Sequence, residues 1–147
     1  MNVDNPHTSA SILDQTLADL ISLGMLAKQA HWNVEGPTFR SLHLLLDELA
    51  DLARDSGDEI AERAITLGHH PDGRAATVAA QNALPDLPAG PIRDQDVIVA
   101  LDAILDSAIR GMHRALDTTD NDPVTQDAIT TIAGRLEKVA WMIRAHR

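Results

Sequence analysis

The sequence of 147 residues contains no cysteine and no tyrosine, and its only aromatic residues are two tryptophans and one phenylalanine. Without cysteine the chain forms no disulfide bonds and offers no thiolate to a metal ion. With so few aromatic rings, its hydrophobic core must be built from aliphatic side chains. A chain of this length is typical of a single domain with a substantial core.

Positive charge is also scarce, because 12 lysines and arginines stand against 22 aspartates and glutamates, for a formal net charge of -10. This balance argues against a surface that coats nucleic acid and favours solubility or the attraction of cations. The N-terminal stretch MNVDNPHTSA lacks the basic and apolar regions of a secretory signal. No uninterrupted apolar run approaches the length of about 18 residues that a membrane span needs. We therefore expect a cytoplasmic protein that contacts no membrane.

Apolar residues recur at helical spacing in four long segments, at about Ser9–Trp32, Pro37–Leu67, Asp94–Leu116 and Asp122–Arg144. Between the second and third lies the segment 68–93, with four prolines and three glycines, in which residues 76–84 favour a short helix. Two helices, a long crossover and two more helices predict an all-α, ferritin-like four-helix bundle. We expect one domain over residues 1–147, with a short tail at 1–8.

Local signals mark where these helices begin and end. Ser11 with Asp14 resembles a capping box at the start of the first helix, and Asp122 followed by Pro123 is typical of the start of the last. Gly36 and Pro37 separate the first helix from the second. The Ser56-Gly57 pair predicts a kink or break within the second helix.

The second helical segment carries polar side chains beside its leucine-rich stripe. His43 and Asp47 are one turn apart, and so are Asp58 and Glu62. At about 100° per residue, the step from Asp47 to Asp58 equals three turns and about 20°, so all four side chains share one face. The two pairs lie roughly 16 Å apart along the axis, whereas a ligand atom lies about 2.0–2.2 Å from its metal ion. One helix therefore cannot bind a single ion with both pairs.

Antiparallel packing of this helix against its own copy would bring one chain's upstream pair to its partner's downstream pair, in two equivalent sites. Gly57, next to Asp58, is small enough to let the partner backbone approach. His31, at the end of the first helix, is the natural fifth ligand. Imidazoles with carboxylates suit Fe(II) and Zn(II). The alternatives are a solvated surface for each pair and a buried, hydrogen-bonded side chain for His31.

The stretch AKQAHWNVEGPTFRSLHLLLDELADLARDSGDEIAERAITLG closely resembles the signature of the Dps proteins, mini-ferritins named as DNA-binding proteins from starved cells. In that signature a His-Trp-Asn, here at 31–33, is followed by His-x-x-x-Asp and then by Asp-x-x-x-Glu. The resemblance covers nearly the whole chain. It implies a hollow dodecamer that oxidises Fe(II) at intersubunit ferroxidase centres, preferring hydrogen peroxide to dioxygen. The Fe(III) product would be stored inside as mineral, which protects against oxidative damage.

Carried over by residue, the resemblance implies a ligand set divided between two subunits. One subunit would contribute His31, His43 and Asp47, and the other Asp58 and Glu62, with Zn(II) as a substitute ion. Trp32, beside His31, would take up stray oxidising equivalents at the same centre. A hydrophobic plug at the dimer seam is the alternative role for this indole.

The family also has acid-lined channels at its three-fold axes, through which iron enters. Candidates here are Asp117, Asp120, Asp122 and Asp127, although Asp122 equally suits an N-cap and the others the positive end of the last helix. On the second helix, away from the ligand line, Glu48, Asp51 and Asp55 are candidates for mineral nucleation, with a solvated face as the alternative. For His69 and His70 in GHHPDGR we expect a surface turn.

DNA binding is where the sequence departs from tightly binding members of the family, which carry flexible basic tails. Residues 1–27 contain no lysine or arginine, and the basic C-terminal stretch RLEKVAWMIRAHR leaves little tail beyond its helix. Because neutralising phosphates needs clustered cations, we expect at most weak DNA binding. The alternatives to an iron-storing ferroxidase are a nucleoid-associated, DNA-binding stress protein with secondary metal binding and a purely structural helical shell.

Overall fold

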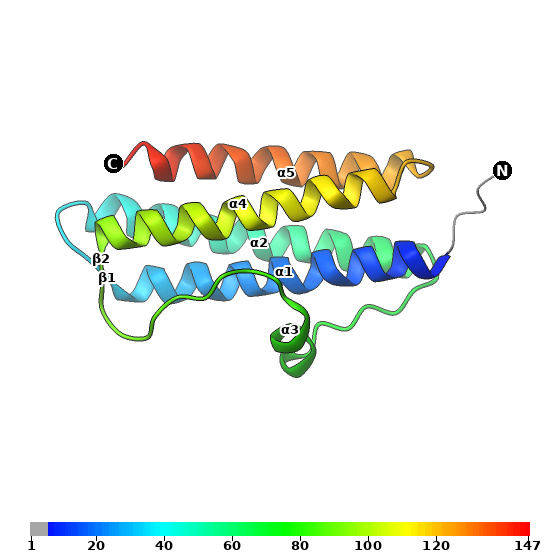
Figure 1. The fold of residues 1–147 in the computed structure, drawn as a ribbon, viewed down its shortest axis with the longest axis horizontal. Helices are drawn as coiled ribbons and strands as arrows, with labels where there is room; N and C mark the ends of the chain where they lie inside the picture. Colours follow the sequence, from blue (N-terminus) through cyan, green and yellow to red (C-terminus); the bar gives the residue numbers. More distant parts are fainter. Residues whose placement is uncertain (1–5) are drawn as a thin grey trace.

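The computed structural model describes the backbone of residues 6–147 and the side chains from residue 10 onward. Its elements are, in order, α1 (Pro6–Asn33), β1 (Val34–Glu35), α2 (Phe39–Thr66), α3 (Ala75–Gln81), β2 (Ile92–Arg93), α4 (Asp94–Thr118) and α5 (Pro123–Arg144). The four long helices lie side by side, and the crossover that carries α3 runs along α1 (Figure 1). The predicted ferritin-like four-helix bundle, with a short helix between its second and third long helices, is confirmed.

The core is aliphatic, as the composition requires. On α2 the side chains of Leu42, Leu46 and Leu49 are fully buried, and each contributes about 1.5–3 kcal/mol of hydrophobic stabilisation. By length and mean hydropathy, the stretch Ala10–Asn33 of α1 would also suit a membrane span, and 56% of its apolar 18-residue window is buried inside the bundle. The core helix of a bundle passes the same test, so this stretch is weak evidence for a membrane.

The helix ends differ from the sequence prediction mainly in α1. It begins at Pro6, so Ser11 and Asp14 lie inside the helix, and the predicted capping box at its start is wrong. Proline suits a first helical position because the N–H that it lacks would have no partner there. Of the predicted tail at 1–8, residues 1–5 lie outside the described residues, and 6–8 belong to the backbone of α1.

The helix α2 is continuous through Ser56 and Gly57, so the predicted break does not occur. Gly57 is buried, and a Cβ atom there would lie 3.7 Å from Leu17 Cδ1 and 3.8 Å from Leu20 Cβ. Gly57 therefore faces α1 of its own chain, where a Cβ atom would make ordinary van der Waals contacts, and our expectation that it faces a partner is wrong. Because α2 is continuous, the angles and distances between its polar side chains follow from regular helix geometry.

A two-residue parallel ladder, which the sequence pattern did not predict, joins the α1–α2 turn to the end of the crossover. Val34 pairs with Ile92, and Glu35 with Arg93. A ladder this short has no room for the alternation of apolar and polar residues that identifies longer strands. It lies at the end of the bundle where α1 ends and α4 begins (Figure 1).

Asp94 is almost fully buried, at 3% exposure, and stabilises the turn between α1 and α2. Its Oδ2 accepts hydrogen bonds from the backbone N and the Oγ1 of Thr38, at 2.9 and 2.7 Å. Gly36 lies against this carboxylate with a φ of 131°, and a Cβ there would lie 2.6 Å from Asp94 Cγ. Only glycine fits both constraints. The end of α1 and the start of α2 are thus held in a fixed relation to α4.

Candidate metal centre

His31 and His43 meet where the end of α1 packs against the start of α2. Nδ1 of His31 lies 2.6 Å from the backbone oxygen of His43, and Nδ1 of His43 lies 2.7 Å from the backbone oxygen of His31. The two rings are stacked, with centroids 3.7 Å apart and planes within 10° of parallel. This reciprocal pair fixes the orientation of both imidazoles.

A carbonyl oxygen can only accept a hydrogen bond, so Nδ1 donates in both rings. In a neutral imidazole the other nitrogen, Nε2, then carries the free lone pair that a metal ion binds. Backbone carbonyls commonly orient metal-binding histidines in this way. His31 is hydrogen-bonded, as its alternative interpretation predicted, but only partly buried, with 12% of its side chain exposed, and the same bond leaves its Nε2 available as a ligand.

Asp47 lies next to the histidine pair. One of its carboxylate oxygens is 4.0 Å from Nε2 of His31 and also forms an ion pair with Nζ of Lys28 on α1. The hydrogen bond from Lys28, aided by the charges of Lys28 and the two histidines, holds the pKa of Asp47 below its usual range against the opposing effect of burial. Asp47 thus stays ionised, with a lysine ammonium beside it.

Lys28 is the site residue that sequence reasoning missed. It stands one turn before His31 on α1, so spacing alone would have placed it on the face of the histidine. The contact with Asp47 depends on how α1 packs against α2, which that spacing does not give.

Asp58 and Glu62 lie further along α2, and both are exposed. Within the described part of the protomer, neither carboxylate takes part in a hydrogen bond or an ion pair. The rise of a continuous helix separates Asp58 from Asp47, the nearest members of the two pairs, by roughly 16 Å. No three histidine, aspartate or glutamate side chains of the described residues converge closely enough to hold a metal ion. Each protomer thus carries the candidate ligands in two separate groups.

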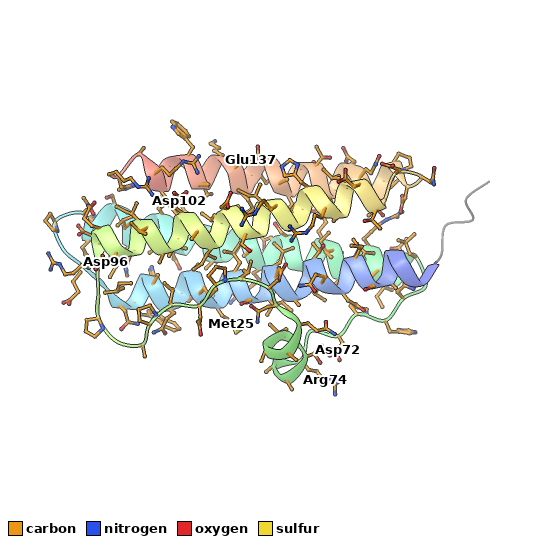
Figure 2. The ribbon with its side chains drawn as sticks, in the orientation of Figure 1. Met25, Asp72, Arg74, Asp96, Asp102 and Glu137 are labelled. Carbon is orange, nitrogen blue, oxygen red and sulfur yellow. The ribbon has the colours of Figure 1, made fainter. Side chains whose placement is uncertain are left out.

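An apolar groove of about 1270 Å³ runs between α1, α2 and the crossover. Gly24, Met25, Ala53 and Asp58 are among the residues that line it. Trp32 also borders the groove and is 69% exposed, so its indole has little cover within its own chain. Figure 2 shows Met25, likewise exposed, on the crossover side of α1. A large apolar side chain left open beside a groove suits contact with another protein surface.

The three acids considered for mineral nucleation do not form one group. Asp51 is only about 40° from Asp47 and 20° from Asp58 around the continuous α2, so it belongs to the ligand face, and our prediction that it lies away from that face is wrong. Asp55 borders the groove, and Glu48 is exposed.

The four acids considered for the channel also differ from one another. Asp122 caps α5, and its carboxylate accepts hydrogen bonds from Thr125 and Arg63.

Burial alone would raise the pKa of Asp122, but the hydrogen bonds from Thr125 and Arg63 outweigh that effect and hold it below its usual range. Because Arg63 lies near the end of α2, this contact ties α2 to the start of α5. The other three channel candidates, Asp117, Asp120 and Asp127, are exposed. They are therefore the ones positioned to face solvent.

The GHHPDGR loop forms the expected turn after α2. The backbone N of His69 donates to the carbonyl of Ala64, 2.9 Å away, and His70 is exposed. Asp72 accepts hydrogen bonds from Arg74 and Thr77, which hold its pKa far below the usual range. Figure 2 shows Asp72 and Arg74 beside α3.

Part of the basic charge at the C-terminus is paired within the chain. Asp102 on α4 forms ion pairs with Arg144 and Arg147, at 3.1 and 2.8 Å. Nε2 of His146 lies 3.1 Å from the hydroxyl of Ser41. These contacts leave fewer cations free for phosphate groups than the sequence count suggests.

Known proteins resemble the chain along its whole length. Residues 10–147 match the ferritin-like domain family. The chain is 35% identical to the fine tangled pili major subunit of Haemophilus ducreyi, over 99% of this chain and 78% of that protein. It is 34% identical to the DNA protection during starvation protein of Agrobacterium fabrum, over 95% of this chain and 87% of that protein.

Solved structures show the same relationship. The structure of Dps from Microbacterium arborescens in the high iron form has a TM-score of 0.91 and 33% identity, covering 99% of this chain and 96% of that one. Dps92 from Deinococcus radiodurans has the same TM-score and identity, covering 95% of this chain and 86% of that one. A full-length ferritin-like match, relatives of this identity and a shared bundle lead to one assignment: the chain belongs to the Dps family of ferritin-like proteins.

Proposed function

We propose that this protein is an iron-storing ferroxidase that oxidises Fe(II) at centres completed by two subunits of a homo-oligomer. The observation that carries the proposal is the reciprocal hydrogen bonding of His31 and His43, which leaves both Nε2 atoms free beside an ionised Asp47. That arrangement is half of a metal site. The solved Dps of Microbacterium arborescens, described as a high iron form, supports iron as the metal.

The other half of each centre comes from the second subunit. When α2 packs antiparallel on its copy, Asp58 and Glu62 of the partner subunit lie opposite Asp47 and His43. Two imidazoles and three carboxylates suit ferrous iron, with Zn(II) as a substitute ion. The anionic ligands stabilise Fe(III) more than Fe(II), which favours loss of the electron. Trp32, beside the centre, either takes up stray oxidising equivalents or closes the dimer seam.

The oxidant we propose is hydrogen peroxide, with dioxygen reacting more slowly. Reduction of one peroxide takes two electrons, which two Fe(II) ions supply, and two protons, and it yields two Fe(III) ions and two waters. Delivering both electrons at one centre avoids the hydroxyl radical that a single electron would release. Removing Fe(II) and peroxide together would protect DNA, the role named in several relatives, without requiring the protein to bind it.

Storage requires an enclosed space, and we propose the dodecameric shell of the family, in the cytoplasm. Asp117, Asp120 and Asp127 are exposed and suit the lining of an entry path for Fe(II). Asp122 already accepts hydrogen bonds from Arg63 and Thr125, so we propose that it stabilises the structure beside this entry path. Glu48 and Asp55 remain candidates for the first contacts with mineral.

The test removes each half of the centre in turn. The Asp58→Ala/Glu62→Ala and His31→Ala/His43→Ala variants should each assemble and lose fast Fe(II) oxidation, followed by absorbance of the ferric product. Reassembling the two variants together should restore activity, because mixed dimers contain one complete centre. The control is Glu59→Ala, which removes a carboxylate beside Asp58 and should keep wild-type activity. Fast oxidation by either double variant alone would refute the assignment.

A further inference from the structure

The proposed centres fix how two α2 helices align. His43 faces Glu62 of the partner subunit, and Asp47 faces Asp58 of the partner subunit. Both pairings place the two-fold axis midway between residues 52 and 53. Because α2 is continuous from Phe39 to Thr66, this alignment extends to every residue between the two centres.

Asp51 and Arg54 flank that axis, one on each side. Around the helix, Asp51 is about 40° from Asp47 in one direction and Arg54 about 20° in the other, so both lie on the face that meets the partner. Each lies about 2 Å along the helix from the axis. The symmetry therefore sets Asp51 opposite Arg54 of the partner subunit, and Arg54 opposite Asp51 of the partner subunit.

The protomer leaves both side chains available for this contact. Asp51 and Arg54 are exposed, and Arg54 borders the apolar groove between α1 and α2. Within the described part of the chain, neither side chain forms an ion pair or a hydrogen bond, although they are only three residues apart on one helix. Their charges are opposite, as the two-fold alignment requires.

A shift of one turn in one direction would place like charges together. If the partner helix slid by one turn in one direction, Asp51 would face Asp58 of the partner subunit, and Asp47 would face Glu62 of the partner subunit. Repulsion between carboxylates opposes that shift. The proposed alignment instead joins opposite charges at Asp51 and Arg54, and the two carboxylates that it brings together, Asp47 and Asp58 of the partner subunit, share a metal ion. Charges at an interface select the partner and the register more than they add affinity.

We propose that Asp51 and Arg54 form two symmetric ion pairs across the dimer axis, which select a second copy of this chain and set the register that completes both metal centres. The inference rests on the proposed function, because the centres define the alignment. It reassigns Asp51 from mineral nucleation to subunit pairing.

Charge exchange between two chains tests the pairing. Asp51→Arg is added to the chain that carries Asp58→Ala/Glu62→Ala, and Arg54→Asp to the chain that carries His31→Ala/His43→Ala. Each chain then repels its own copy at the axis and attracts the other chain at both contacts. Without charge exchange, random pairing makes about half of the dimers mixed, and with one complete centre each they give about one quarter of wild-type activity. Charge exchange should raise this to about one half.

A second arm should shift pairing in the opposite direction. Asp51→Arg/Arg54→Asp in one chain restores opposite charges in its own dimers and places like charges against a chain without these changes. Mixed dimers, and the activity that depends on them, should then fall below the random level. As a control, Glu59→Arg in place of Asp51→Arg changes the charge equally, but off the contact face, and should leave random pairing.

Mixed dimers are also counted directly, by native mass spectrometry of dimers in which one chain is labelled with nitrogen-15. Helix content by circular dichroism verifies that every variant folds. One result would overturn the ion pairs but leave the metal centres in place. In it, the mixed fraction stays at the random level in both arms, while the mixture without charge exchange is active. Biased pairing without any activity supports the ion pairs and overturns the centres.

Discussion

The ion pair between Lys28 and Asp47 involves one of the ligands proposed for the metal centre. The carboxylate is ionised and already beside a positive charge, so in the proposed centre a metal ion would have to displace the ammonium group before binding that oxygen. The lysine thus keeps a negative side chain compensated while no metal is bound. It would also compete with a metal ion for the carboxylate.

Replacing the lysine should therefore strengthen metal binding. We expect Lys28→Met to bind Co(II) or Zn(II) about two- to fivefold more tightly, the range set by the free energy of a partly exposed ion pair. Titration calorimetry of the assembled protein would measure the change. Lys28→Arg, which keeps the positive charge, should stay near the wild type. Weaker binding by Lys28→Met would show instead that the lysine assists the metal.

Individual residues also show how much of the proposed site could be predicted from the sequence alone. The histidines and carboxylates of the proposed centre could be singled out from the sequence because one helix carries most of them at regular spacing. The tautomer of each histidine was not, because it depends on a carbonyl twelve residues away across a helix–helix contact. Asp51 was misplaced although its spacing from Asp47 is one turn, so that error came from the interpretation and not from missing information.

At the scale of the helices, local signals were sufficient where a cap or a proline fixes the boundary. Asp122 and Pro123 begin α5 as predicted, since the cap and the proline act within one turn. The start of α1 and the β1–β2 ladder were missed. The ladder depends on Val34 meeting Ile92 after the crossover has traversed the bundle, and no local pattern encodes that contact.

The junction around Asp94 should depend on pH in a defined direction. Hydrogen bonds from the backbone and side chain of Thr38 hold the pKa of Asp94 below its usual range. The ionised group therefore stabilises the fold above the pKa of an unfolded aspartate, and this contribution is lost as pH falls through the lower, folded pKa.

Comparison with Asp94→Asn measures this contribution. In urea unfolding at pH 7 the variant should be less stable than the wild type, because an amide replaces the charged acceptor. The difference should begin to shrink as pH falls below about 4, where the aspartate of the unfolded chain becomes protonated, and should be lost once pH passes the lower pKa of the folded state. Asp96→Asn on the same helix, which removes an exposed carboxylate, should unfold like the wild type at both pH values. A difference that persists unchanged in acid would contradict the role of the ionised carboxylate.

At the scale of the whole molecule, charge governs contact with DNA. The chain is acidic, and two of its C-terminal arginines are held by Asp102 on α4, a residue labelled in Figure 2. Pairing within the chain lowers the positive charge that each subunit offers to phosphates. Weak binding that salt abolishes is the expected behaviour of such a surface.

Releasing those arginines should increase DNA binding. We expect Asp102→Asn to retard duplex DNA more than the wild type in a gel shift at low salt. Its dependence on salt should steepen by about 0.9 in log–log slope for each arginine that gains a phosphate contact. Asp96→Asn changes the net charge equally without freeing an arginine of the described chain. Equal retardation by both variants would attribute the effect to net charge alone.

The separation of the two ligand groups along α2 also has a kinetic consequence, if the proposed centres hold. A chain leaving the ribosome carries no complete centre, so it cannot begin redox chemistry before it has found a second chain. At concentrations where dimers dissociate, the rate per volume would rise with the square of the protein concentration. During synthesis in the presence of ferrous iron, a lone chain would then start no oxidation, because the reactive centre first forms in the dimer from which the shell is assembled.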